Sequence, residues 1–372
     1  MASSSSSHLP PSVFNPRRHV GVHAEHVSNV SNTEFPGHYP EEDHAWSLAK
    51  FKENLKMSVK RLSQRSVEFD LVGVDASIAN AFRRIMIAEV PTIAIEDVFI
   101  FNNTSVIQDE ILSHRLGLVP LNVDPRLFEF RPPGGLPTDR NTLVFKLNVK
   151  CERVKKASKD APQIINQVVT TADLVWEPQG EQDTVFAVNP PAATNKDIVL
   201  AKLAPEQIIE MELHAVKGLA KEHAKWSAVA TASYRLHPLV VLNPAKPVPP
   251  EHAEKFARCF SPGVVKIGPR GAVSIDERAL RKETMSREVL RHKEFDGCVE
   301  LKRVRDWFIF SVESEGPYTP ESLLPEAIKV MRGKIASIRA AAEALLADSE
   351  DLGSGAAGSG PDVDGDVEMG GE

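Results

Sequence analysis

Three polar side chains near the middle of the chain have the types and spacing of an acid–base cluster. Asp109, Glu110 and His114 fall close together, and on a helix the imidazole lies about one turn from the carboxylates. Such a pair could exchange protons with a substrate, as in a hydrolase. The surrounding sequence offers no nucleophile on a sharp turn and no second metal ligand. We therefore expect a structural role, in which these groups cap a short helix and bond the loop after it.

A basic helix and a basic loop suggest a different chemistry, the binding of phosphate. Arg83 and Arg84 are adjacent, and Lys217–Lys225 is a lysine-containing loop around Gly218. Gly218 is not followed by the Gly-Lys-Ser/Thr ending of a nucleotide-binding loop, so we exclude nucleotide binding there.

The net charge also bears on nucleic-acid binding. From Asp348 onward the chain has eight acidic residues and no basic one, and removing them from the formal net charge of −7 leaves +1. A near-neutral body argues against a protein that mainly grips nucleic acid.

The cysteines argue against a disulfide framework and a metal centre. Cys151, Cys259 and Cys298 lie far apart and form no Cys-x-x-Cys pair. We expect no cofactor and no bound metal. The sequence has no apolar run of membrane-spanning length, and its serine-rich start lacks the apolar core of a signal peptide. We expect a soluble intracellular protein without a membrane partner.

The elements that position these residues begin with one helix. Asp75 can cap a helix start, and Ile78, Phe82, Ile85 and Met86 follow at helical spacing. Pro91 ends that helix. A strand is predicted over 93–100, and a short helix over 108–116 that ends in a left-handed Gly117.

These segments together carry a long motif. It comprises Asn80, Arg83, Arg84, Val90, Pro91, Thr92, Ala94, Ile95, Asn103, Thr104, Ser105, Val106, Asp109, Glu110, Leu112, His114, Arg115, Leu116, Gly117, Leu118, Pro120 and Leu121. The motif resembles the signature of the α-like subunits of cellular RNA polymerases. The likeness extends from about Ser66 to about Leu346, and is greatest to the larger α-like subunit shared by RNA polymerases I and III.

The resemblance and the local patterns predict an α+β fold. We expect an RNA polymerase α-subunit-like dimerisation domain, with a mixed sheet and long packed helices, interrupted by a β-rich insert. The predicted parts are a disordered arm (1–45), the dimerisation domain (46–101 and 226–347), the insert (102–225) and a disordered acidic tail (348–372). Predicted strands include 67–71, 142–149, 168–175, 184–188 and 227–235, a hairpin around 305–306, and a helix-prone segment over 276–292.

The last predicted helix, Thr319 to Ala347, has a coiled-coil pattern. Its apolar residues step by four and three, the spacing that keeps one seam facing another helix. They are Leu324, Ile328, Met331, Ile335, Ile338, Ala342 and Leu345. The alternative is packing against the chain's own sheet. A length of about 40 Å at the helical rise favours a partner chain.

The resemblance implies partners and the absence of catalysis. It implies a heterodimer with the smaller α-like subunit through the long helix. It also implies contacts to the two largest subunits, and the predicted contact to the second-largest subunit is made by Asn80, Arg83 and Arg84. The expected location is the nucleus, in nucleolus and nucleoplasm, and nucleic acid is contacted only through the complex.

Two alternatives stay open at this stage. The polymerase II relative binds zinc in its insert through clustered cysteines, whereas this chain has only Cys151 there, which favours polymerases I and III. From a different class, a DNA-binding transcription factor would use Arg83, Arg84 and the Lys217–Lys225 loop.

Overall fold

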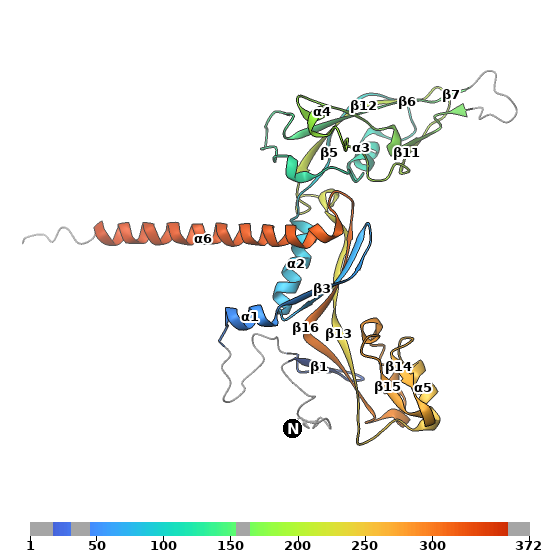
Figure 1. Cartoon of the computed structure of the whole chain (residues 1–372). Helices are drawn as coiled ribbons and strands as arrows, with labels where there is room; N and C mark the ends of the chain where they lie inside the picture. The colour runs from blue at the N-terminus through green and yellow to red at the C-terminus, as the bar shows by residue number, and fades with distance from the viewer. Residues whose placement is uncertain (1–17, 31–44, 154–163, 356–372) are drawn as a thin grey trace, which may run out of the picture. The chain divides into compact units, whose positions relative to one another are not determined.

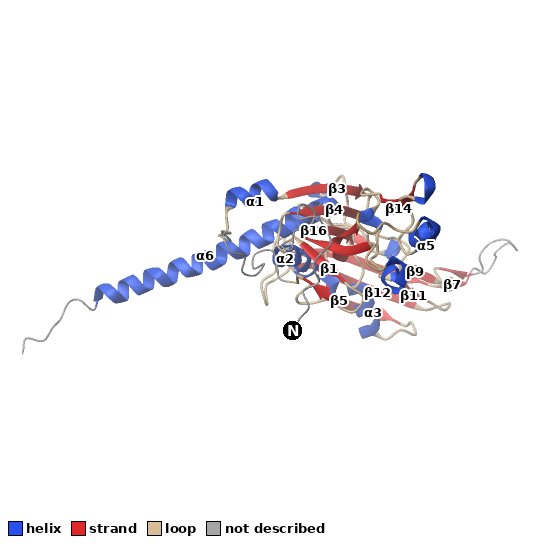
Figure 2. Cartoon of the chain, turned by 90° about the horizontal axis from the view of Figure 1, so that it is seen from below, coloured by secondary structure: helices blue, strands red, loops and turns tan. Residues whose placement is uncertain are grey.

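A computed structural model describes residues 18–30, 45–153 and 164–355 (Figure 1). The chain divides into two units, 1–327 and 328–372. The described helices are α1 (Leu48–Asn54), α2 (Ala76–Ala88), α3 (Asp109–Gly117), α4 (Gln182–Val185), α5 (Ala253–Arg258) and α6 (Leu323–Gly355). Figure 2 shows α6 as one continuous helix and the strands gathered into sheets.

The main sheet has six strands built around the longest one. Its order is β2-β1-β16-β4-β3, with β13 also pairing with β16. The strands are β1 (His19–Val22), β2 (Val27–Ser28), β3 (Lys56–Leu62), β4 (Ser66–Val72), β13 (Val229–Leu242) and β16 (Val299–Ser314). The α+β class is confirmed, but the described pairings of this sheet are antiparallel rather than mixed.

Alternating apolar residues bury one face of this sheet. Val67, Phe69 and Leu71 of β4 are all buried, as the predicted strand required. Phe69 stacks on Phe310 of β16 with ring centroids 4.9 Å apart. The first turns of α6 contribute the buried Leu323 to the interior. The core therefore joins strands that lie more than 200 residues apart in the sequence.

A second sheet lies largely within the range of the predicted insert. Its order is β10-β6-β12-β5, all antiparallel, and its strands are β5 (Thr92–Asn103), β6 (Thr142–Lys150), β10 (Val175–Glu177) and β12 (Ile208–Gly218). One face packs in a core that includes Leu112 and Leu116 of α3. Because β5 pairs with β12 from Thr92 onward, this sheet begins ten residues before the predicted start of the insert at 102.

Three two-stranded sheets complete the described strands. They pair β7 (Glu152–Arg153) with β8 (Ile164–Ile165), β9 (Val168–Thr170) with β11 (Val199–Lys202), and β14 (Val265–Ile267) with β15 (Val273–Ile275). The strand predicted over 168–175 is therefore broken by a short 3-10 turn at Thr171–Asp173. The strand predicted over 184–188 is wrong, since Gln182–Val185 form α4, whose Gln182 side chain bonds the carbonyls of Asp139 and Thr142.

The predicted hairpin at 305–306 is also wrong. β16 continues through Arg305 and Asp306 as one strand. The register against β13 moves from Phe308 opposite Leu236 to Val304 opposite His237, so the extra residues form a bulge. The N–H of Gly73 bonds the carbonyl of Asp306 there, which fixes the bulge to β4.

Two predicted boundaries near the ends also change. Part of the predicted disordered arm is ordered, because β1 pairs with β16 and Arg305 N–H bonds the carbonyl of Arg18. The last helix continues to Gly355, eight residues past the predicted end, so the predicted tail begins inside it. Residues 1–17, 31–44 and 356–372 lie outside the described residues.

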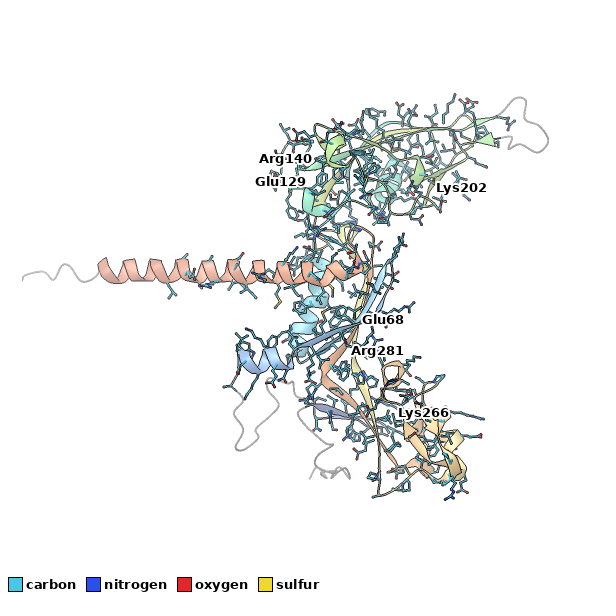
Figure 3. All side chains as sticks on the ribbon, in the orientation of Figure 1. Glu68, Glu129, Arg140, Lys202, Lys266 and Arg281 are labelled. Atoms are coloured by element: carbon cyan, nitrogen blue, oxygen red, sulfur yellow. The ribbon has the colours of Figure 1, made fainter. Side chains whose placement is uncertain are left out.

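The charged segment 276–292, predicted to be helix-prone, does not form a continuous helix. It contains short 3-10 turns at Leu280–Lys282 and Glu288–Arg291. Met285 and Arg287 have positive φ angles between them, which interrupts helical geometry. Arg281 reaches β4 instead, where it bonds Glu68 and Asp70 (Figure 3).

Candidate functional site: the subunit interface and the motif junction

The first predicted interface helix is α2, which starts at the predicted cap. The Asp75 side chain accepts a 2.8 Å hydrogen bond from the N–H of Ser77. Ala79, Ile85 and Met86 are buried, so the opposite face carries the polar motif residues. Arg83 donates through Nε and an Nη to Oδ1 of Asn80, at 3.1 and 2.9 Å.

This pairing orients the Arg83 guanidinium. A single amide oxygen receives two of its five N–H groups, and the others remain available for a second acceptor. Arg84 is exposed and has no hydrogen bond or ion pair within the described part of the chain. The helix thus presents one oriented and one unrestrained cation on a partly exposed face, which suits the recognition of carboxylates.

The α3 motif residues bind backbone and side chains nearby. Asp109 accepts from Nδ2 of Asn103 at 2.6 Å. Arg115 donates to the carbonyls of Leu200 and Val199 at 3.1 and 2.6 Å, so it holds β11 against α3. Glu110 is exposed. These hydrogen bonds to an amide and to backbone carbonyls hold neighbouring segments together, as expected of a structural role.

The acid–base alternative gains no support from this arrangement. His114 is exposed and faces the ring of His223, 6.3 Å away between centroids. Asp109 is engaged by Asn103. Within the described ranges, no three His, Cys, Asp or Glu side chains are grouped so that they could hold a metal ion, and Cys151, Cys259 and Cys298 are buried free thiols.

Gly117 does not form a left-handed turn, and a side-chain carbon at this position would make only ordinary contacts. It lies within α3, and the helix ends on Leu118 in right-handed geometry. A Cβ at Gly117 would lie 3.4 Å from the carbonyl oxygen of Ile95 and 3.7 Å from Cδ of Lys225. The predicted left-handed end is wrong because the helix meets β5 and the returning chain at this point.

Lys225, in the segment that follows β12, contacts the start of β5, which carries part of the family-like motif. Its Nζ donates to the carbonyl of Ile95 at 2.8 Å, pairs with Glu96, and lies 4.5 Å from the centroid of the Trp226 ring. The side chain is 11% exposed. A buried ammonium with a carboxylate, a carbonyl and an aromatic face as partners is satisfied, so it fixes the geometry of the junction.

Trp226 completes this junction from the other side. Its Nε1 donates to the carbonyl of Val216 at 3.1 Å, and its own carbonyl accepts from Thr92 Oγ1 at 2.8 Å. A Cβ at Gly218 would lie 2.3 Å from the indole. The junction of Thr92, Gly117, Gly218, Lys225 and Trp226 is called here the motif junction. The sequence analysis did not predict these contacts.

The predicted seam on α6 is exposed from its second turn onward. Leu324 is buried, whereas Ile328 is 39% and Ile338 70% exposed. The same stripe contains the exposed Ile335 and Leu345 and the half-buried Met331. These large apolar residues follow heptad spacing and stay exposed in the described chain. Such a row is typical of a helix that packs against a second helix.

A second apolar surface lies on the edge of the main sheet. β3 pairs only with β4 among the described strands, and all its residues are exposed. Met57, Val59 and Leu62 are 52–55% exposed. They pair with the buried Leu71, Phe69 and Val67 of β4. The apolar face of the sheet therefore extends onto β3, where its side chains are exposed. An exposed apolar edge strand of this kind can pair with a strand of another chain.

The chain matches a known family over most of its length. A family model described as "RNA polymerase Rpb3/Rpb11 dimerisation domain" matches residues 68–335. The chain belongs to this family. The predicted family is confirmed, and its dimerisation domain includes α2, the motif junction and the exposed start of the α6 seam.

Individual relatives separate the classes of polymerase. The "DNA-directed RNA polymerases I and III subunit RPAC1" of Homo sapiens is 47% identical over 314 residues, covering 83% of this chain and 90% of the relative. That of Saccharomyces cerevisiae is 45% identical over 324 residues, covering 85% and 96%. The "DNA-directed RNA polymerase II subunit rpb3" of Dictyostelium discoideum is 30% identical over 298 residues, covering 76% and 93%. The predicted preference for polymerases I and III is confirmed.

No helix in the described segments combines the length and apolarity that a membrane crossing requires.

Proposed function

We propose that this chain is the larger α-like subunit shared by RNA polymerases I and III, and that it acts as a scaffold without catalysing nucleotide transfer. Relatives that are 45% and 48% identical are named as a subunit of RNA polymerases I and III, whereas a polymerase II subunit is 30% identical. Its task is to assemble the enzymes that make ribosomal RNA, 5S RNA and transfer RNA. It belongs in the nucleus, in the nucleolus for polymerase I and the nucleoplasm for polymerase III.

The observation that carries the scaffold proposal is the exposed α6 seam. Ile335, Ile338 and Leu345 are 55%, 70% and 70% exposed. Burying a side chain of that size contributes about 1.5–3 kcal/mol, so a matching helix gains strongly by covering the row. The partner is the smaller α-like subunit, which packs its own helix against the seam and its sheet edge against β3.

The polar face of α2 contacts the second-largest subunit. Arg83 is already oriented by Asn80, which lowers the entropy lost when its guanidinium binds a carboxylate. Replacing both Arg83 and Arg84 by alanine should weaken capture of that subunit and leave the α-like pair intact. Unchanged capture would contradict this role.

The motif residues Asp109, Glu110, His114, Arg115 and Gly117 act structurally, by fixing the insert to the main domain. Their observed partners are an amide, backbone carbonyls and a second imidazole, none of which is a reactive arrangement. The catalytic work of the polymerase then lies in the other subunits, and the chain needs no cofactor of its own.

The decisive experiment is purification of the tagged chain from its own cells, with identification of the associated proteins by mass spectrometry. The largest and second-largest subunits of both polymerases I and III, with one small α-like protein, are expected. Polymerase II large subunits in their place would correct the class. Absence of polymerase subunits, with salt-dependent binding of the isolated chain to duplex DNA, would favour the transcription-factor alternative.

A further inference from the structure

The helix and strand that precede β4 form regular structure but bury almost nothing in the described chain (Figure 1). α1 has no buried residue, and every residue of β3 is exposed. A helix of seven residues is too short to be stable in water by itself. α1 therefore depends on a surface that covers it, and the described residues do not provide one.

One apolar row runs from α1 onto β3. Leu48, Phe51 and Leu55 share a side of the helix because they are three and four positions apart. Leu55 has extended backbone at the helix end, so it also begins the alternation that Met57 and Val59 continue along β3. Phe51 is half-buried, and the other four side chains are 40–52% exposed.

Trp46 lies at the start of this row. Its ring is 6.2 Å from that of Phe51 between centroids, and the two residues flank the Ser47 cap at the positions where an apolar pair fixes the entry of a chain into a helix. That local contact still leaves Trp46 68% exposed. Tryptophan is among the residue types that most often anchor a protein interface.

The polar side chains of the same segment are mostly basic. Between residues 45 and 65 the sequence has six lysines and arginines, and Glu53 is the one acidic residue. The side chains of Lys50, Lys52 and Lys56 have no ion pair within the described residues. Lys60 lies 3.9 Å from Asp70, which offsets one charge. A complementary surface is therefore acidic as well as apolar.

The free edge of β3 favours a strand as the partner. β3 pairs with β4 and with no other described strand, so its outer N–H and C=O groups can bond a further strand. Strand addition reads alternate side chains while the main chains pair. A nucleic acid would neutralise the lysines but would leave the aliphatic row uncovered. A strand that alternates apolar and acidic residues satisfies the row, the lysines and the edge together.

We propose that α1 and β3 together bind an extended segment of the smaller α-like subunit in which apolar and acidic residues alternate, with Trp46 as the aromatic anchor. The short turn before α6, Pro320–Ser322, lies against β4, the neighbour of β3. The surface therefore continues from the place where α6 begins. The inference rests on the proposed function, which supplies the partner, and it adds α1 to the interface and a charge to the partner strand.

The test measures the dissociation constant between the full-length chain and the full-length smaller α-like subunit. Trp46→Ala should raise that constant at least tenfold, as expected for an interface anchor. Val59→Asp should also raise it at least tenfold, because it places a charge in the apolar row. Val175→Asp is the matched control, since Val175 is a 64% exposed valine on β10, an edge strand of the insert sheet, and it should change nothing.

Lys52→Glu with Lys56→Glu tests the charge of the partner strand. The double variant should raise the dissociation constant about tenfold at low salt, and the effect should shrink at high salt because exposed charges are screened. Lys202→Glu is the control, because Lys202 is an exposed strand lysine of β11 without an ion pair among the described residues (Figure 3). A double variant that binds as tightly as the Lys202→Glu control would overturn the inference.

A photo-crosslinking amino acid at Val59, in polymerase purified from its own cells, identifies the occupant even if a substitution impairs folding. Irradiation is expected to link it to the smaller α-like subunit, at a segment that alternates apolar and acidic residues. A link to nucleic acid, to this chain itself, to another subunit or to a segment without acidic residues would overturn the inference, as would equal effects of Val59→Asp and Val175→Asp. Failure of the unmodified chain to bind the smaller α-like subunit would instead overturn the proposed function.

Discussion

Lys225 donates a 2.8 Å hydrogen bond to the carbonyl oxygen of Ile95, although 130 residues separate the two in the sequence. The bond connects β5 with the segment that follows β12. Strands β6, β10 and β12, which lie between them in the sequence, form a sheet with β5 that packs on a core of its own. Lys225 therefore ties the start of β5 to the segment that follows β12.

Replacing Lys225 by methionine should lower the free energy of unfolding by about 1–3 kcal/mol. The change keeps most of the apolar stem but leaves the Ile95 carbonyl and Glu96 without their shared donor. Chemical denaturation of the heterodimer measures it. Lys221→Met is the control, because Lys221 is 55% exposed in a surface pair with Glu89, and it should cost under about 1 kcal/mol. Equal effects would contradict the role of Lys225.

A Gly218→Ala variant tests the packing at the same junction. The new Cβ would lie 2.3 Å from the indole of Trp226, and Trp226 cannot retreat without breaking its bond to Val216. We expect a destabilisation of roughly 1–3 kcal/mol or more. Gly333→Ala on α6, where no atom lies within 4 Å of the new Cβ, should stabilise by up to about 1 kcal/mol. Thermal unfolding compares the two.

The seam on α6 predicts a loss of the partner without a loss of the fold. Ile335→Asp with Ile338→Asp places charges in the row that a second helix would bury, and should weaken association with the smaller α-like subunit more than tenfold. Co-expression and size-exclusion chromatography measure it. Arg339→Ala removes only an exposed pair with Glu343, so it should leave the complex intact. A complex that stays intact in the double-aspartate variant would contradict the proposal that this seam binds the partner.

The local patterns predicted much of the fold, because capping and periodicity act within a few residues. Asp75 caps α2 as predicted, and β4 buries the three apolar residues that alternate along it. The long helix and its stripe also follow from spacing alone, although the helix continues past the predicted end at Ala347 to Gly355.

The remaining features depend on contacts between distant segments. Arg305 and Asp306 suggested a turn, but β13 pairs with β16 on both sides of them, which makes the pair part of a bulge in one strand. Gly117 fitted a left-handed helix end, whereas the helix ends on Leu118 in right-handed geometry and Gly117 lies beside Ile95 and Lys225. No local rule places those residues together.

Stability should fall as the pH is lowered, with His237 as one cause. His237 stacks on Trp307 with centroids 4.1 Å apart, and burial lowers its pKa from the ordinary value of 6.5. A depressed folded-state pKa means that the unfolded chain binds the proton more readily. Stability is therefore complete above pH 6.5 and decreases as the pH falls below it.

His237→Phe keeps an aromatic ring against Trp307 and should reduce the slope of unfolding free energy between pH 7 and about 5. It should not abolish the slope, because burial also lowers the pKa of His19 and His23. Denaturation at a series of pH values gives the slopes. An unchanged slope in the variant would show that His237 protonates equally well in both states.

Arg281 attaches the segment 276–292 to the main sheet, and its removal should be among the costly single changes. It donates to Glu68 at 2.7 Å and to Asp70 at 3.1 Å, and Asp70 is 2% exposed. Arg281→Met leaves that buried carboxylate with Lys60, 3.9 Å away, as its one remaining ion-pair partner among the described residues, and should destabilise by about 3–5 kcal/mol. Arg291→Met, at an arginine that is 76% exposed, serves as the control.

A double variant separates the worth of this ion pair from the cost of an unpaired charge. Removing one partner leaves Asp70 buried and uncompensated, whereas Arg281→Met with Asp70→Leu removes both charges. The double variant should therefore recover part of the stability lost by Arg281→Met, a positive coupling of more than about 1 kcal/mol in a double-mutant cycle. Additive losses would mean that Arg281 stabilises the segment through the packing of its stem and not through Asp70.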